Sequence, residues 1–414
     1  MYGIRYLFAL MLFILFSAAR VSASGGEYEN FSDRKASDIL TADKVTGEHY
    51  KIRENVPSYG YMDHFTVDSD YGVFEVTGDA ALRKLLREIA AMGALEKIKS
   101  TKAFGKALAE SAKKPIQFAG NLVTEPVNTI SSIPKGVGRL FSNAYESITT
   151  KKQAGEDSSA EALLTLSKYK REYAYHLGVD AYSSNPVFQK ELNRVGWAAA
   201  VGNLSFSAAT APISGGIGLA ISYTGFAQKM NEYLKDQPPS QIRSDAEKRL
   251  SAIGISKEDI KKFLETKSFS PRHTAVIVTS LVKLEDVKGR DVYLRYAITA
   301  SDEEQADFMM HMVETMRGFH EKVSRLKEIS MHSGLVTASA ANDFVLIPLP
   351  IDYGIWTEHA EKIMRDMVSS VSLARGGHLE LWVTGTVSAF ARKNLEDLGV
   401  NVVDNVGRTI DFMD

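Results

Sequence analysis

The spacing of the apolar residues changes at about residue 331 of this 414-residue chain, and this change constrains the fold more than any other feature. From residue 79 onward, apolar residues recur at helical spacing, as in Leu82, Leu85 and Ile89. After residue 331, short β-rich runs and helical patterns follow one another in the order ββαβαβ, which is typical of a small α/β domain. The sequence therefore predicts a mainly helical α+β protein.

Several boundaries can be predicted from turn and capping signals. The residues Asp68–Gly72 separate two β-rich runs and predict an N-terminal β-hairpin, after which Asp79 is expected to cap a helix. A long helix is expected from Ser301 to about Glu328. Five regions follow from these signals: a signal peptide (1–23), a leader with the hairpin (24–78), a basic amphipathic helical region (79–155), a central helical domain (156–330) and a small α/β domain (331–414).

The first 23 residues have the pattern of a secretory signal peptide. Arg5 supplies a positive charge, Tyr6–Phe16 is an unbroken apolar run, and Val21-Ser22-Ala23 provides small residues for cleavage. An uncleaved anchor is the alternative, but the apolar run is shorter than the roughly 20 residues that a spanning helix needs. We therefore expect an exported protein, periplasmic or secreted, that is cleaved after Ala23.

Composition removes several classes of function. The 49 Lys and Arg residues nearly balance the 51 Asp and Glu residues, and a net charge of −2 argues against nucleic acid as a partner of the whole chain. The chain has no cysteine, which excludes disulfides, thiol catalysis and thiolate zinc sites. We expect neither a cofactor nor a bound metal.

The region 83–114 combines an apolar stripe with many cations. The membrane-contact candidates are Arg83, Lys84, Arg87, Lys97, Lys99, Lys102, Lys106, Lys113 and Lys114. Only three acidic residues (Glu88, Glu96 and Glu110) oppose these nine, so the local balance is 9 − 3 = +6. A helix with an apolar face and a cationic face can lie on an anionic lipid surface, where each cation contributes about 1 kcal/mol. The alternative is a helix that packs on its own protein and leaves its lysines in solvent.

The run 195–228 contains no charged residue and is broken at Pro212–Gly216. It could form a membrane hairpin, but each arm is shorter than a membrane span. Its small residues also allow close packing of helices in a protein core. We favour the buried helical pair and keep partial insertion as the alternative.

Two further groups suggest chemistry. Met312, Met316 and His320 lie at i, i+4 and i+8 of one predicted helix, and thioether and imidazole ligands suit Cu(I), although methionines more often fill core gaps. His176 with Asp180, and Asp352 near Trp356, could belong to a hydrolase-like site between the helical region and the α/β domain. We favour a structural role for both groups, keep copper binding and catalysis as the alternatives, and assign no catalytic residue.

Three blocks of sequence resemble a group of uncharacterised secreted bacterial proteins. They are Gly60-Tyr61-Met62 with Phe65-Thr66-Val67, His176-Leu177-Gly178-Val179-Asp180 with Ser184-Asn185-Pro186, and Leu349-Pro350-Ile351-Asp352-Tyr353 with Trp356-Thr357. The resemblance implies a bacterial, exported protein and carries over no site residue. Together these observations favour a non-enzymatic envelope protein that contacts an anionic membrane surface, a protein partner or both; the hydrolase is the alternative.

Overall fold

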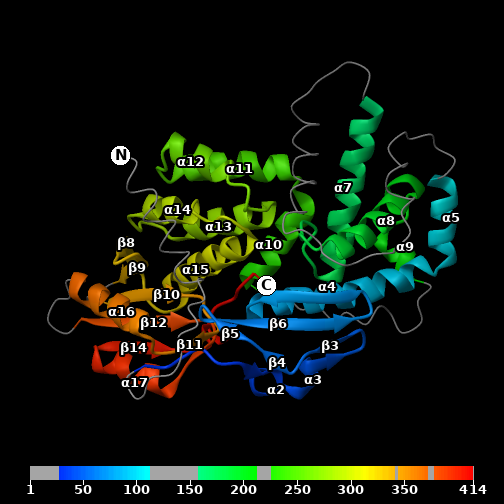
Figure 1. The fold of residues 1–414 in the computed structure, drawn as a ribbon. Coiled ribbons are helices and arrows are strands. Elements are labelled where there is room, and N and C mark those ends of the chain that lie inside the picture. Colours follow the sequence, from blue (N-terminus) through cyan, green and yellow to red (C-terminus); the bar gives the residue numbers. More distant parts are fainter. Residues whose placement is uncertain (1–27, 112–156, 212–224, 341–343, 372–376, 414) are drawn as a thin grey trace.

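The computed structural model describes residues 28–111, 157–211, 225–340, 344–371 and 377–413 (Figure 1). The chain is a mainly helical α+β protein, as the sequence predicts. The expected signal peptide, 1–23, lies outside the described residues.

An antiparallel sheet forms the N-terminal part. Its central strand β6 (Met62–Ser69) pairs with β3 (Tyr50–Ile52), β5 (Ser58–Tyr59) and β7 (Gly72–Thr77). The β6–β7 pair is the predicted hairpin, which closes where Ser69 faces Gly72. Short elements complete this part: β1 (Arg34–Lys35), α2 (Ala36–Ile39), α3 (Ala42–Val45), β2 (Thr46–Gly47) and β4 (Asn55–Val56).

Helix α4 (Asp79–Lys99) packs on this sheet and on α8 (Pro186–Gly202). Asn185 caps α8 by accepting the N–H groups of Val187 and Phe188, and Pro186 is the first residue of the helix. The other helices here are α5 (Lys102–Ser111), α7 (Asp157–Leu177) and α9 (Phe206–Thr210). Their apolar faces and the sheet enclose one hydrophobic core, the first core, which extends from Ala36 to Ala209.

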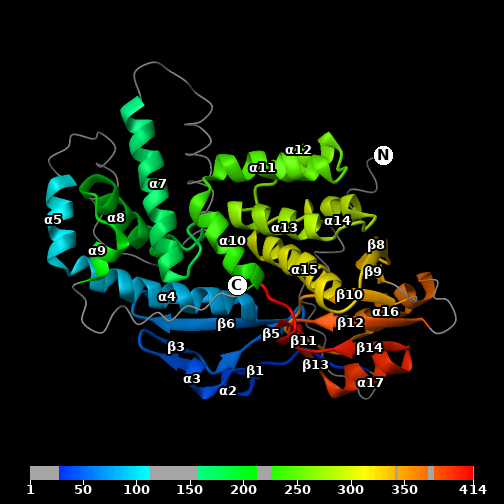
Figure 2. The same cartoon turned by 180° about the vertical axis from the view of Figure 1, so that it is seen from behind.

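The helices from α10 to α15 form layers above the C-terminal sheet. They are α10 (Gly225–Asp236), α11 (Pro239–Ala252), α12 (Lys257–Leu264), α13 (Pro271–Lys283), α14 (Arg290–Ala297) and α15 (Glu303–Lys322). The α11–α12 layer lies on α13 and α14, and α15 lies between them and the sheet in both views (Figures 1 and 2). All of these elements share the second core with the C-terminal sheet.

The C-terminal sheet has the strand order β14-β12-β10-β9-β8. Its strands are β8 (Leu326–His332), β9 (Leu335–Ala340), β10 (Phe344–Leu349), β12 (His378–Val383) and β14 (Val400–Val403). Strands β10, β12 and β14 are parallel, and the chain returns between them through α16 (Glu358–Ser370) and α17 (Ala389–Asp397). A small pair, β11 (Tyr353–Gly354) with β13 (Thr386–Val387), and a turn of 3₁₀ helix, η3 (Val406–Arg408), complete the chain.

One predicted boundary is wrong. The helix expected to reach Glu328 ends at Lys322, and the next residues form β8. The N–H of Leu326 donates to Nδ1 of His320, which turns the chain back toward the sheet. The chain then forms a hairpin, because Ser333 and Gly334 make a tight turn with positive φ angles that pairs β8 with β9.

Part of the described uncharged run packs inside the protein, whereas residues 203, 207, 208 and 211 are exposed. Within 195–211, Val195, Ala198, Leu204 and Ala209 are buried in the first core, which agrees with the buried arm that we favoured. The expected turn at Pro212–Gly216 lies outside the described residues. In the part of the chain that the structure describes, no helix combines the length and the apolar character needed to cross a membrane.

Candidate functional site

The two cores meet where α4 passes the N-terminal end of α15. Nζ of Lys84 on α4 lies 2.7 Å from Oε1 of Glu303 on α15. One turn further along α15, Oδ1 of Asp307 lies 2.8 Å from Nε2 of His273 on α13. Burial opposes the charge of Lys84, but the carboxylates of Glu303, Asp307 and Glu88 outweigh it and raise the pKa of Lys84. Polar and charged side chains therefore connect α4, α13 and α15.

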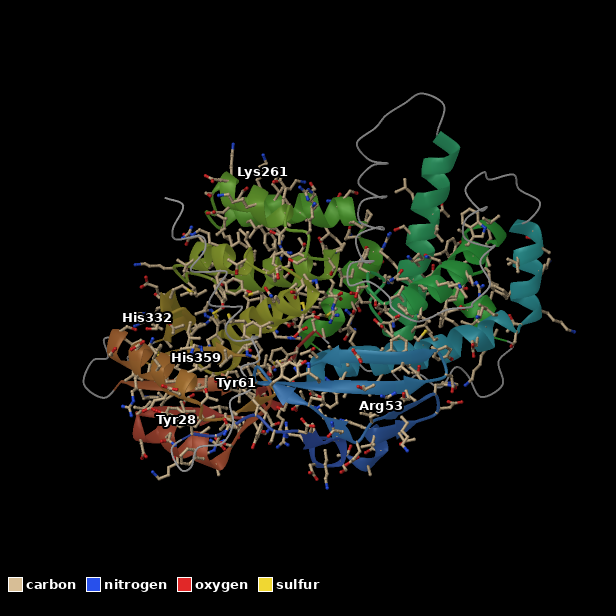
Figure 3. All side chains as sticks on the ribbon, viewed as in Figure 1. Tyr28, Arg53, Tyr61, Lys261, His332 and His359 are labelled. Carbon is tan, nitrogen blue, oxygen red and sulfur yellow. The ribbon has the colours of Figure 1, made fainter. Side chains whose placement is uncertain are left out.

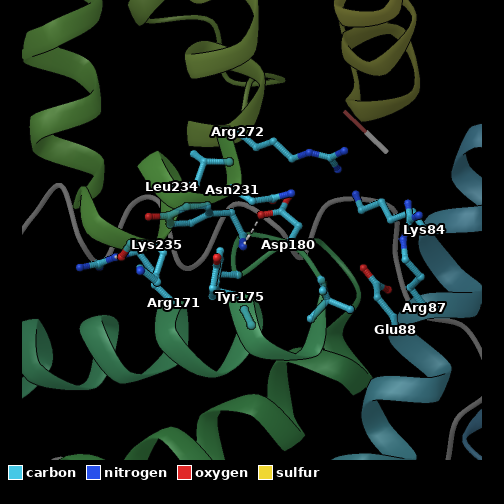
Figure 4. A pocket seen from close by; sticks show the side chains of 15 residues that line it. Lys84, Arg87, Glu88, Arg171, Tyr175, Asp180, Asn231, Leu234, Lys235 and Arg272 are labelled. Atoms are coloured by element: carbon cyan, nitrogen blue, oxygen red, sulfur yellow. Dashed lines mark hydrogen bonds between the residues drawn. The ribbon is translucent and has the colours of Figure 1, made fainter. Parts of the chain in front are cut away.

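A small cavity of about 30 Å³, the junction pocket, lies beside this network (Figure 4). Its charged lining residues are Lys84, Arg87 and Glu88 of α4, Arg171 of α7, Asp180 after α7, Lys235 of α10 and Arg272 of α13. Uncharged polar side chains, among them Tyr175, Tyr182 and Asn231, complete the polar part of the lining.

The packing of the helices fixes the cations at the pocket. Nε of Arg171 donates to the carbonyl of Lys235 at 3.0 Å, which ties α7 to the end of α10. Nζ of Lys235 lies 4.7 Å from the ring centroid of Tyr175, a cation–π contact. Nη2 of Arg272 donates to the carbonyl of Met413.

The acids at the pocket are engaged by neighbours. Glu88 is only 2% exposed, and its Oε2 accepts a hydrogen bond of 2.9 Å from Nδ2 of Asn185. Burial raises the pKa of Glu88, although the charge of Lys84 opposes this shift. Oδ1 of Asp180 accepts the N–H of Tyr182 at 2.8 Å. Both acids thus have structural partners within the protein.

The charge balance of the pocket defines what it can hold. Five cations and two acids line it, and two of the cations have acidic partners nearby, because Lys84 pairs with Glu303 and Nζ of Lys235 lies 3.4 Å from Asp236. Three arginines then face two acids, which leaves a small excess of positive charge. The cavity of about 30 Å³ is larger than the roughly 10–15 Å³ that one buried water requires. It is far smaller than a site that holds a drug-sized molecule. The arrangement therefore suits one small anionic group, such as a carboxylate or a phosphate.

The structure separates the nine cations of the predicted basic face. Lys84 pairs with Glu303, Arg83 with Asp79, and Lys99 with Glu191, and Nζ of Lys97 lies 3.8 Å from Glu48. Arg87 lines the junction pocket. Lys102 and Lys106 on α5 are exposed, whereas Lys113 and Lys114 lie outside the described residues.

The apolar stripe of the same region faces the protein. Leu82, Leu85, Ile89, Leu95 and Ile98 of α4 are buried in the first core. The leucines of α4 are consequently not available to a lipid surface in this fold. Membrane contact remains a prediction. Among the described candidates Lys97, Lys102 and Lys106 are exposed, and of these Lys97 lies 3.8 Å from Glu48.

Asp352, one of the residues considered for a hydrolase, joins the two cores. Its Oδ2 accepts the N–H of Asp63 at 2.9 Å, and its Oδ1 accepts the N–H of Asp79 at 3.1 Å. Asp352 therefore caps α4 from a distant part of the chain. Asp79, the predicted cap, is instead the first residue of the helix and follows Gly78, which supplies no side-chain cap.

Two of the resemblance blocks meet at the same place. The N–H groups of Asp352 and Tyr353 donate to the carbonyl of Tyr61 at 3.1 and 3.2 Å. The hydroxyl groups of Tyr61 and Thr357 are 2.9 Å apart. Figure 3 shows Tyr61 where the N-terminal sheet approaches the C-terminal sheet. These motif residues hold the two parts of the molecule together.

His176 does not pair with Asp180 in the described structure. Its ring stacks on Phe206, with centroids 4.6 Å apart, and burial lowers its pKa. Neither His176 nor Asp352 lines the junction pocket. The hydrolase-like site is thus not assembled around these residues.

The copper-binding alternative fails on packing. Met312, Met316 and His320 are at most 3% exposed, and both methionines belong to the second core. Nδ1 of His320 accepts the N–H of Leu326, and Nε2 lies 2.7 Å from Nη1 of Arg325. Both ring nitrogens therefore have protein partners, which leaves His320 unsuited to a metal ion.

No known protein family, curated protein or solved structure matches the chain. The assignment of the site therefore depends on its geometry. Sequence reasoning singled out Lys84 and Arg87 for another role and missed Arg171, Asn231, Lys235 and Arg272. These four lie on three different helices, and no local spacing signals that they converge.

Proposed function

We propose that this chain is an exported, non-enzymatic protein that binds the anionic group of a small ligand in the junction pocket. One observation carries the proposal: five cationic side chains from four helices converge on one cavity between the two cores. Binding sites are frequently found where domains meet, and an excess of positive charge in a cleft attracts anions.

The size of the cavity limits the ligand. A group of the size of a carboxylate, phosphate or sulfate is the largest that we expect inside, and the rest of a larger molecule would extend out of the pocket. Arg87, Arg171 and Arg272 provide planar donor groups that suit such anions. We expect Lys235, whose side chain is 31% exposed, to lie nearest to solvent.

A panel of salts at equal ionic strength tests this proposal. The mature protein is heated in phosphate, sulfate, acetate or chloride, and the midpoint of unfolding is recorded. A ligand at 100 times its dissociation constant adds about 2.7 kcal/mol to the free energy of unfolding, so a binding anion raises the midpoint. Equal midpoints in all four salts would contradict the proposal.

A second function, contact with anionic membrane, is favoured by one feature of α5. Lys102 and Lys106 are exposed on this helix, and Leu108 is 48% exposed beside them. Cations next to an exposed apolar side chain suit a lipid interface. We keep this contact as a second proposal, now restricted to α5.

The five-region layout expected from the sequence also stays a proposal. The two cores support one principal division, between residues 36–209 and 226–413. Limited proteolysis with mass spectrometry of the fragments would locate the boundaries.

A further inference from the structure

The C-terminal segment 409–413 runs along α15, and charged side chains hold its backbone. The N–H of Met413 donates to Oε1 of Glu314 at 2.8 Å, and Nη2 of Arg317 donates to the carbonyl of Asp411 at 2.7 Å. Nζ of Lys322 donates to the carbonyl of Thr409 at 2.9 Å. These bonds fix the course of the segment.

Apolar contacts also anchor the segment. Ile410 and Met413 are each 2% exposed and belong to the second core. Ile410 packs directly on Gly318 of α15, where an added Cβ would lie only 2.4 Å from Cγ2 of Ile410. The segment is thus an integral part of the fold.

Arg272 connects this segment to the junction pocket. It lines the pocket, is only 5% exposed, and donates from Nη2 to the carbonyl of Met413. A guanidinium group has its five N–H donors in one fixed plane, so a bond to one of them sets the direction of the others. The carbonyl of Met413 therefore fixes how Arg272 faces the pocket.

A second contact reaches α10. Oδ2 of Asp411 lies 3.0 Å from the position that a Cβ would take at Gly225, the first residue of α10. Asn231 and Lys235 of the same helix line the pocket. The segment therefore touches two of the four helices that build the site.

We propose that segment 409–413 is a positioning element of the anion site: it orients Arg272, and an anion in the pocket in turn stabilises the segment. This inference rests on the proposed function. Coupling between two sites is reciprocal in free energy. If docking of the segment strengthens anion binding by a given free energy, anion binding stabilises the docked segment by the same free energy. The opposite sign, in which the anion takes Arg272 from Met413 and loosens the segment, is the competing outcome.

Hydrogen–deuterium exchange and calorimetry on the mature protein test the inference, with inorganic phosphate as the probe. We expect phosphate to slow exchange in the peptide that contains 409–413. Ile410→Ala loosens the segment without changing a pocket residue, and it should raise the dissociation constant for phosphate roughly fivefold or more. Leu395→Ala, at a buried position on α17 in the same core, is the control and should bind as the wild type does.

The outcomes separate the two proposals. If wild-type protein binds no phosphate, sulfate or acetate, the proposed function fails and this inference fails with it. The inference alone is overturned if the wild-type protein binds phosphate but hydrogen exchange at 409–413 is unchanged or faster. It is also overturned if Ile410→Ala binds phosphate as tightly as the wild type does. Should Ile410→Ala not fold, Ile410→Val, which removes one methylene, is expected to give a smaller rise in the dissociation constant, and no rise would also overturn the inference.

Discussion

Lys84 and Glu303 form a 2.7 Å ion pair that joins α4, in the first core, to α15, in the second. Their side chains are 17% and 35% exposed, so the pair is partly buried. A surface ion pair contributes less than about 1 kcal/mol to stability, and the disruption of a buried pair costs about 3–5 kcal/mol. We expect the cost of breaking this pair to fall between these values. The pair is thus a link between the two halves of the molecule and is not part of a free cationic face.

Replacing one partner should destabilise the protein measurably. We expect Lys84→Met to lower the free energy of unfolding by about 2 kcal/mol, because the carboxylate of Glu303 loses its counter-charge. Urea denaturation measures the effect. Lys262→Met, which removes the exposed pair between Lys262 and Glu258, is the matched control and should cost less than about 1 kcal/mol. Equal costs for the two variants would refute a linking role for Lys84.

Asp352 is expected to matter for stability because it satisfies two backbone donors. Asp352→Ala leaves the N–H groups of Asp63 and Asp79 without their acceptor and removes the cap of α4. Each loss of this kind costs about 1–2 kcal/mol, so the free energy of unfolding should fall by about 3 kcal/mol. Ser37→Ala, at an exposed position, should change it by less than about 0.5 kcal/mol. A loss for Asp352→Ala no larger than for Ser37→Ala would show that the cap is unimportant.

The same residue predicts a pH dependence. Burial raises the pKa of Asp352 to about 7 from an ordinary 3.8; the amide of Asp63 and the cations Arg83 and Arg34 oppose this shift, whereas the charge of Asp63 adds to it. The folded protein then holds a proton that the unfolded chain has released. The stabilisation that comes from this proton is therefore complete below about pH 4 and is lost as the pH rises to about 7, at up to about 1.4 kcal/mol per unit.

Urea denaturation of wild type and Asp352→Asn at pH values between 4 and 8 tests this dependence. The difference between the two curves isolates Asp352, because the other titrating groups are common to both proteins. We expect the wild type to lose stability relative to the variant as the pH rises. A difference that is constant over this range would show that Asp352 does not titrate there.

Membrane contact through α5 predicts a specific effect of two lysines. Lys102→Glu with Lys106→Glu should reduce binding to phosphatidylglycerol-containing vesicles at low salt at least tenfold, because two cations of about 1 kcal/mol each are removed. Vesicle flotation measures the bound fraction. Lys229→Glu with Lys261→Glu, at exposed positions on α10 and α12, makes the same change in net charge and is the control. Similar losses for both pairs, or equal binding to neutral vesicles, would exclude α5 as the contact.

Much of the local structure could be predicted from the sequence because its signals are local. The β6–β7 hairpin, the cap at Asn185 and the start of α16 after Thr357 all follow from turn and capping chemistry within a few residues. The predicted end of α15 is wrong, although the turn at Ser333 and Gly334 that joins β8 to β9 is also a local signal.

The candidate site depends, more than the local structure does, on contacts between residues that are far apart in the sequence. The cations of α4 show helical spacing in the sequence, but no pattern reveals that Glu303, 219 residues after Lys84, neutralises one of them. Arg171, Lys235 and Arg272 reach the junction pocket only because α7, α10 and α13 pack together. Likewise, Asp352 caps α4 from 273 residues beyond Asp79. Only the tertiary structure brings these residues together.

Calorimetric titration of the protein with inorganic phosphate at low salt tests anion binding most directly, with Lys235→Gln and Lys229→Gln as the pair of variants. Both remove one charge from α10, but only Lys235 lines the pocket. We predict one saturable site in wild type and in Lys229→Gln, and affinity at least fivefold weaker in Lys235→Gln because a charged hydrogen-bonding partner is worth about 1.5–3 kcal/mol. No saturable heat in wild type, or equal affinity in both variants, would contradict the proposed site.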